Sequence, residues 1–140
     1  MPTKTSPFHA CRACACWALR RASRAVTQHY EASFRGTGLR ATQFTLLAVL
    51  AQTGPLPLTE LATSVGLERT SLTRNLRPLE KRGLVSSAGA DDQRIRRIAI
   101  TKKGEAAALA ALDAWNQAQS TVGEVLRRTG VGKLVGARRG

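Results

Sequence analysis

The chain has 140 residues, which is enough for one domain with a single hydrophobic core and too few for a second independent domain. It contains 22 Lys and Arg against 9 Asp and Glu, which gives a formal net charge of +13. This excess is far beyond what solubility requires and indicates a polyanionic partner, either nucleic acid or an acidic membrane surface.

The apolar stretch from Ala10 to Leu19 does not have the layout of a secretory signal. Arg12 interrupts it, and Arg20 and Arg21 follow it, whereas a signal peptide carries its basic residues before the apolar region. The chain contains no run of about 18 or more apolar residues, which a helix needs to cross a bilayer. We therefore expect a cytoplasmic protein without a membrane partner, in which the cysteines are reduced thiols.

Two helices are expected in the first part of the chain. Residues 1–9 contain two prolines and small polar residues, typical of a flexible arm. Small or apolar residues then recur every three or four positions, which predicts one long helix over about 10–35, ended by Gly36. The nearly all-apolar segment 42–52 predicts a second helix that is buried on several sides.

A helix-turn-helix is predicted next. A short amphipathic helix begins at Leu58 and is closed by Gly66, and a second helix begins near Arg69 and is ended by Gly83. Leucines fall within about 60° on one face of the second helix, and hydroxyl and basic side chains occupy the opposite face. That arrangement is typical of a helix that enters the DNA major groove. The candidate DNA contacts on it are Thr70, Ser71, Thr73, Arg74, Arg77 and Lys81.

Arg74 is the first choice for reading a base, because a guanidinium can donate two hydrogen bonds to guanine. Lys81, near the end of the helix, is better suited to a phosphate. The alternative interpretation is a solvated helix face without any partner.

A β-hairpin is predicted after Gly83. Residues 84–87 and 95–100 have strand character, and 88–93 form the connection. Arginines on or beside this wing can enter the narrow minor groove, and the candidates are Arg94, Arg96 and Arg97. Asp92 either orients Arg94 by a charge-assisted hydrogen bond or caps its own turn. Thr101 is a predicted N-cap for a final helix over about 102–128, and 131–140 is a short tail.

Five segments in order resemble the MarR family of bacterial transcription regulators. They are Thr59-Glu60-Leu61-Ala62, the run from Arg69 to Leu76, Lys81-Arg82-Gly83-Leu84-Val85, and Asp92-Gln93-Arg94 followed by Ile100-Thr101-Lys102-Lys103-Gly104. The resemblance implies a MarR-type domain over 10–130, mainly α-helical with a small β-hairpin wing. Its winged helix-turn-helix would span about 42–101, between dimerisation helices at about 10–35 and 102–128.

The resemblance also implies a mode of action. Family members are homodimers that bind a pseudo-palindromic operator in double-stranded DNA, with half-sites about one helical turn apart. They commonly act as repressors that a small aromatic or lipophilic effector, or thiol oxidation, releases from DNA. After Gly130 this chain departs from the family, which usually continues with another leucine-rich dimerisation helix. No cofactor is implied.

Residues His9, Cys11, Cys14 and Cys16 leave three interpretations open. On one rigid helix Cys16 lies about 160° from Cys14, so the cysteines cannot all face one metal ion. Unwound, the four residues would suit zinc or a thiophilic metal, and Cys11 with Cys14 could form a redox pair. The simplest interpretation is small thiols that pack in a helix interface.

The family resemblance places an effector cavity between the dimerising helices and the winged domain. Trp17, Arg20, Tyr30 and Arg40 are the candidates to sandwich and neutralise an aromatic acid. The alternative is that the aromatic residues belong to the core or the dimer contact and that the arginines are solvated.

Three other classes of function compete with an operator-binding regulator. An enzyme is not expected, because the sequence lacks a glycine-rich phosphate loop, a nucleophile elbow and a paired histidine-carboxylate cluster. A winged-helix protein that binds nucleic acid by charge alone, without an operator, remains open. So does a thiol- or metal-responsive sensor that uses the N-terminal cysteines.

Overall fold

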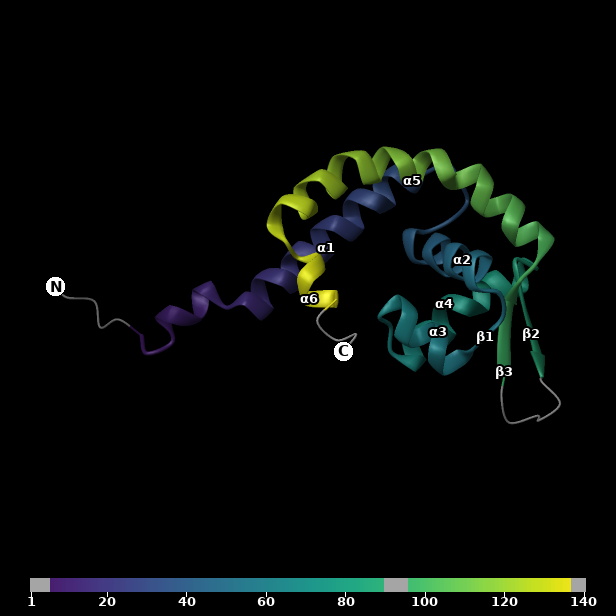
Figure 1. The fold of residues 1–140 in the computed structure, drawn as a ribbon, viewed down its shortest axis with the longest axis horizontal. Coiled ribbons are helices and arrows are strands. Elements are labelled where there is room, and N and C mark those ends of the chain that lie inside the picture. Colours follow the sequence, from purple (N-terminus) through teal and green to yellow (C-terminus); the bar gives the residue numbers. More distant parts are fainter. Residues whose placement is uncertain (1–5, 90–95, 137–140) are drawn as a thin grey trace.

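The computed structural model describes residues 6–89 and 96–136, and in these ranges it is helical with one small antiparallel sheet (Figure 1). The predicted fold class is confirmed. The helices are η1 (His9–Ala13, a 3-10 helix), α1 (Ala15–Phe34), α2 (Ala41–Thr53), α3 (Leu58–Val65), α4 (Arg69–Lys81), α5 (Lys102–Thr129) and α6 (Gly132–Gly136). The strands are β1 (Leu56–Pro57), β2 (Val85–Gly89) and β3 (Arg96–Ile100). Within the described ranges, no helix is both long enough and apolar enough to cross a membrane.

The predicted helix-turn-helix consists of α3 and α4. Gly66 ends α3 in the left-handed conformation, with φ of 70°, which a residue without a side chain adopts at least cost. The Leu67 amide then donates to the Ala62 carbonyl at 2.9 Å and closes the turn. As a result, α4 begins at Arg69, where the sequence predicts it.

The sheet has the order β1-β3-β2, and both pairs are antiparallel. The predicted hairpin is present, with Val85 opposite Ile100 and Gly89 opposite Arg96. Strand β1 was not predicted, because two residues give no alternating pattern and one of them is a proline. The predicted connection at 88–93 lies mostly outside the described residues, and its first two residues belong to β2.

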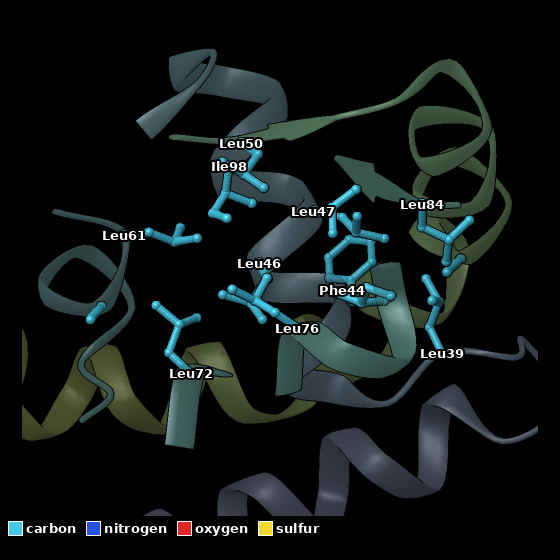
Figure 2. Packing of buried hydrophobic residues seen from close by; sticks show 14 of the residues in the cluster. Leu39, Phe44, Leu46, Leu47, Leu50, Leu61, Leu72, Leu76, Leu84 and Ile98 are labelled. Carbon is cyan, nitrogen blue, oxygen red and sulfur yellow. The ribbon is translucent and has the colours of Figure 1, made fainter. Parts of the chain in front are cut away.

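A single hydrophobic core joins α2, α3, α4 and the sheet (Figure 2). Burying a leucine or isoleucine side chain contributes about 1.5–3 kcal/mol to folding, so this cluster is the main source of stability. Its largest fully buried members are Leu46, Leu47, Leu50, Leu61, Leu72, Leu79, Leu84 and Ile98.

The long helices α1 and α5 lie side by side, and α5 arches over α1 and α2 (Figure 1). The Tyr30 hydroxyl of α1 donates a hydrogen bond to the side-chain oxygen of Gln119 on α5. The first turns of α1 and the end of α5 extend past the core, on the side away from the sheet. Both therefore offer side chains that the core does not cover.

The prediction of one continuous helix from Ala10 is wrong. The Cys14 backbone is extended, with φ of −61° and ψ of 117°, so the 3-10 helix η1 stops there and α1 begins at Ala15. The side chains that suggested periodicity in this stretch are exposed, so burial does not favour one continuous helix there. At the other end of the chain, the predicted tail contains the short helix α6.

Thr101 is the N-cap of α5, as predicted. Its hydroxyl accepts a hydrogen bond from the Gly104 amide at 3.0 Å and donates one to the Gly83 carbonyl at 2.6 Å. Gly104 is pressed against Leu84, because a Cβ atom at Gly104 would lie 2.1 Å from the Leu84 carbonyl oxygen. The start of α5 is therefore held against the residues that follow α4.

We predict that Gly104→Ala lowers the free energy of unfolding by about 2 kcal/mol or more, because backbone atoms must move to admit the methyl group. Gly123→Ala, in the same helix, is the control, since its new Cβ would meet only the movable end of Gln119. It should change stability by about 1 kcal/mol at most. Urea denaturation measures the free energy of unfolding of both variants. Equal losses in the two variants would contradict the prediction.

Candidate nucleic-acid interface

The front of α4 carries the candidate DNA contacts, and its back is buried. Leu72, Leu76 and Leu79 are 0–3% exposed, whereas Arg74 and Arg77 on the other side are exposed. The amphipathic pattern therefore selects the buried face correctly. Because the leucine face of α4 is packed in the core, the helix that carries the arginine side chains is held in place.

Four of the six predicted α4 residues border one shallow hollow of about 480 Å³. Thr70, Thr73, Arg74 and Arg77 line it, whereas Ser71 and Lys81 do not. The Thr73 hydroxyl donates to the Arg69 carbonyl at 2.9 Å, which leaves its oxygen free to accept. Two further residues line this hollow that were not among the predicted contacts, Leu58 and Arg69.

The wing is described at its base only. Arg96 and Arg97 begin β3, and both are exposed. Asp92, predicted in the connection, and Arg94, predicted on or beside the wing, lie outside the described residues.

The Arg96 side chain joins β2 of the wing to α4. Its guanidinium donates to the Glu80 carboxylate at 3.1 Å and to the Ser87 hydroxyl at 2.9 Å. Strand alternation puts Arg96 on the face of Ile98, which is buried, and Arg97 on the opposite face. The neighbouring arginines therefore have different surroundings, and Arg96 is partly neutralised by its carboxylate partner.

The end of α4 has a second attachment. The Arg82 guanidinium donates to the Gly38 carbonyl at 2.7 Å, in the loop between α1 and α2. Arg82 therefore joins the end of α4 to the loop that follows α1.

A cavity of about 500 Å³ lies between α1, α2, α5 and the turn that joins α3 to α4. Of the four predicted pocket residues, only Tyr30 lines it. Trp17 is 52% exposed near the start of α1, Arg20 donates to the Cys16 sulfur at 3.6 Å, and Arg40 pairs with Glu31 at 3.7 Å.

The sequence analysis missed Trp115, which lines the cavity from α5. Its place at helical spacing after Ala111, which is buried, puts it on the inner side of α5. That spacing was available in the sequence, but the position of α5 relative to α1 was not.

The three cysteines are exposed and unbridged. Cys11 lies in η1, Cys14 at the break and Cys16 in the first turn of α1. Across residues 6–89 and 96–136, no three His, Cys, Asp or Glu side chains are close enough together to hold a metal ion.

The comparisons with known proteins agree with this geometry. The MarR family model matches residues 39–95. The crystal structure of the M. tuberculosis transcriptional regulator MosR is 36% identical to the chain, with a TM-score of 0.78, over 91% of this chain and 96% of MosR. The chain belongs to the MarR family.

Further solved structures have the same fold. MosR in complex with DNA is 38% identical, with a TM-score of 0.74, over 91% of this chain and 99% of that one. The transcriptional repressor CouR bound to a 23-mer DNA duplex is 23% identical, with a TM-score of 0.73, over 94% and 96% of the two chains, and at this identity the likeness shows the fold alone. Among curated proteins, none matches the chain significantly in sequence.

As a MarR-family protein, the chain is a transcription regulator and not an enzyme. The family model covers α2 to β2 and leaves α1, β3 and all of α5 outside its range. Those helices, which form two walls of the cavity, are matched by the MosR structure.

Tyr30 provides a direct test of the cavity, because it is the only tyrosine in the chain. Burial raises the pKa of its hydroxyl above the ordinary value of 10.0, since a desolvated phenolate is disfavoured. The neutral phenol is therefore favoured by folding, and its contribution to stability is present below pH 10 and is lost as the pH rises through the folded-state pKa.

We predict that the absorbance of tyrosinate appears at higher pH in the folded MarR-family regulator than in the same chain in denaturant. Coincident titration midpoints would show that Tyr30 is solvated and that the wall of the cavity it forms is open to water.

Proposed function

We propose that this regulator binds a pseudo-palindromic operator in double-stranded DNA as a homodimer. The observation that carries the proposal is the front of α4, where Arg74 and Arg77 are exposed beside hydroxyl side chains while the leucines behind them are buried. A helix of this kind can enter the major groove, and the wing beside it can follow the backbone into the minor groove. The structure of MosR in complex with DNA, at 38% identity, supports the same use.

A second copy of the chain is the proposed cover for the long helices. Their ends carry large apolar side chains that are exposed in the single chain, which is unusual unless a partner covers them. Such a dimer would present two α4 helices to two half-sites. The exposed apolar side chains on α1, α5 and α6 are Trp17, Leu19, Leu109, Leu112, Val125, Leu126 and Leu134.

We propose that the protein is a cytoplasmic repressor that an effector releases. The α3–α4 turn, Val65 to Leu67, forms part of the cavity wall. A molecule in the cavity therefore touches the segment that positions the start of α4. Any movement of that turn changes how α4 meets a groove, which couples occupancy to affinity for DNA.

Thiol oxidation is the second candidate signal. The specific observation is that Cys11, Cys14 and Cys16 are all exposed, at a break between two helical segments. An exposed thiol is open to oxidants, and a new bond there would change the course of the chain before α1. The sequence left open that the cysteines pack in a helix interface. In the single chain all three are exposed, which does not support that role.

The test is a titration onto DNA from upstream of the protein's own gene, with excess competitor DNA, in reduced and mildly oxidised samples. We expect a discrete complex that survives competition. Loss of the complex after oxidation, but not in a variant with serine at all three cysteines, would support the thiol signal. If competitor DNA removes the protein from every promoter fragment tested, the result would instead support charge-driven, sequence-independent binding.

Arg74→Ala should weaken operator binding and reduce the preference for operator over competitor DNA by about tenfold, since a good pair to one base is worth about 1–3 kcal/mol. Arg128→Ala is the matched control, because Arg128 is at the far end of α5 and pairs with Glu124. Electrophoretic mobility shift measures both. An unchanged preference in the Arg74 variant would remove its assigned role in base reading.

Arg97→Gln should reduce the slope of log affinity against log salt by about one, because one phosphate contact is lost. Arg96→Gln should change that slope less, since Glu80 already partly neutralises Arg96. Fluorescence anisotropy over a range of salt concentrations separates the two. Equal changes would mean that Arg96 leaves Glu80 and contacts DNA directly.

A further inference from the structure

The end of α4 is attached to both long-helix regions at two consecutive residues. Arg82 is the C-cap of α4, and its guanidinium donates to the Gly38 carbonyl at 2.7 Å, in the loop that follows α1. The next carbonyl, that of Gly83, accepts a hydrogen bond from the Thr101 hydroxyl at 2.6 Å, at the start of α5. The end of α1 and the start of α5 therefore both contact the same point of α4.

The loop that receives Arg82 is held in shape by its own contacts. The Thr37 hydroxyl donates to the Phe34 carbonyl at 2.6 Å and accepts from the Leu39 amide at 3.1 Å. Leu39 is 5% exposed and belongs to the same core cluster as Leu84 (Figure 2). These contacts fix the backbone on both sides of Gly38, so a hydrogen bond to the Gly38 carbonyl fixes a position.

The backbone that carries the Arg82 side chain is also fixed. The Arg82 amide donates to the Pro78 carbonyl at 3.1 Å, and the Leu84 amide donates to the Leu79 carbonyl at 2.9 Å. Gly83 has a φ of 71°, the left-handed conformation that commonly ends a helix. Leu79 and Leu84 are at most 1% exposed. The Arg82 bond therefore joins two parts of the chain that are each anchored in the core.

Arg82 is exposed and basic, so a contact to a DNA phosphate is the alternative role. The two roles predict different behaviour. A phosphate contact strengthens binding to every DNA duplex and carries no sequence information. A contact that orients α4 relative to α1 affects the geometry that two copies of the chain present together, and it leaves the number of phosphate contacts unchanged.

We propose that Arg82 is a positioning residue that sets which separation of half-sites the regulator accepts. The long helices α1 and α5 are the elements proposed to join two copies, so a contact that fixes α4 to their ends also fixes one α4 relative to the other. This inference rests on the proposed binding of a two-half-site operator by a homodimer. Each base pair added between half-sites moves one of them by about 3.4 Å and rotates it by about 35°.

Fluorescence anisotropy with three duplexes tests the inference on the full chain. They are the operator and the same operator with one base pair inserted or deleted at its centre. We expect the unsubstituted protein to prefer the natural spacing. In Arg82→Met, which keeps the stem and removes the donors, that preference should fall by about threefold to tenfold, the usual effect of losing an exposed hydrogen bond of a charged group.

Lys81→Met is the matched control, because Lys81 is the neighbouring exposed cation and a candidate phosphate contact. It should weaken binding to all three duplexes equally and lower the slope of log affinity against log salt by about one. Arg82→Met should leave that slope unchanged. An unchanged spacing preference in Arg82→Met, or an equal loss of affinity for all three duplexes, would overturn the inference. Circular dichroism confirms that each variant is folded.

A second measurement needs neither DNA nor a dimer. Spin labels are attached at Gln28→Cys on α1 and Glu60→Cys on α3, two exposed positions, in a chain with serine at all three native cysteines. Labelled chain is diluted with excess unlabelled chain, so that double electron–electron resonance records distances within one chain. The distribution should be broader or shifted after Arg82→Met and unchanged after Lys81→Met.

Equal distance distributions before and after Arg82→Met would overturn the inference. The two proposals fail in different ways. A protein that forms no discrete complex with any operator contradicts the proposed function, whatever the spin labels show. A protein that prefers one spacing, and keeps that preference in full after Arg82→Met, retains the proposed function and contradicts only the role of Arg82.

Discussion

The position of α4 depends on the burial of Leu72, Leu76 and Leu79 against α2 and the sheet, and the rest of the interface depends on that position. Each of these leucines is at most 3% exposed, and each contributes about 1.5–3 kcal/mol to folding. The exposed face of the same helix contributes little to stability, which leaves it free to carry arginines. One face thus fixes the helix, and the other is available for a polyanion such as DNA.

Polar contacts tie both ends of the winged unit to its surroundings. Arg82 holds the Gly38 carbonyl between α1 and α2, Arg96 joins the wing to Glu80 of α4, and Thr101 joins Gly83 to the start of α5. Exposed pairs of this kind add little free energy. Their effect is to orient α4, the wing and the long helices relative to one another.

The cavity lies where these parts meet, and the proposed control by an effector rests on that position. Its walls come from α1, α2, α5 and the α3–α4 turn, so its contents contact both the long helices and the segment before α4. The cavity is lined by aromatic, small apolar and hydroxyl side chains and by no charged one, which sets it apart from the basic front of α4.

The sequence by itself determined the elements with strong local signals. Leucine periodicity predicted the buried face of α4. Gly66 predicted the turn before that helix, and Thr101 predicted the start of α5. Prediction from the sequence failed where local signals are weak or lack burial. The stretch before Ala15 is exposed and is not one continuous helix, and β1 is a two-residue strand that pairs with β3. The short helix α6 in the predicted tail was also missed.

Only the tertiary structure decided which residues share a site. Trp115 lines the same cavity as Tyr30 because α5 packs against α1. Arg96 differs from Arg97 because Arg96 pairs with Glu80. Spacing along the chain encodes the faces of a helix or strand. It does not encode which of those faces meet, since that depends on how the whole core packs.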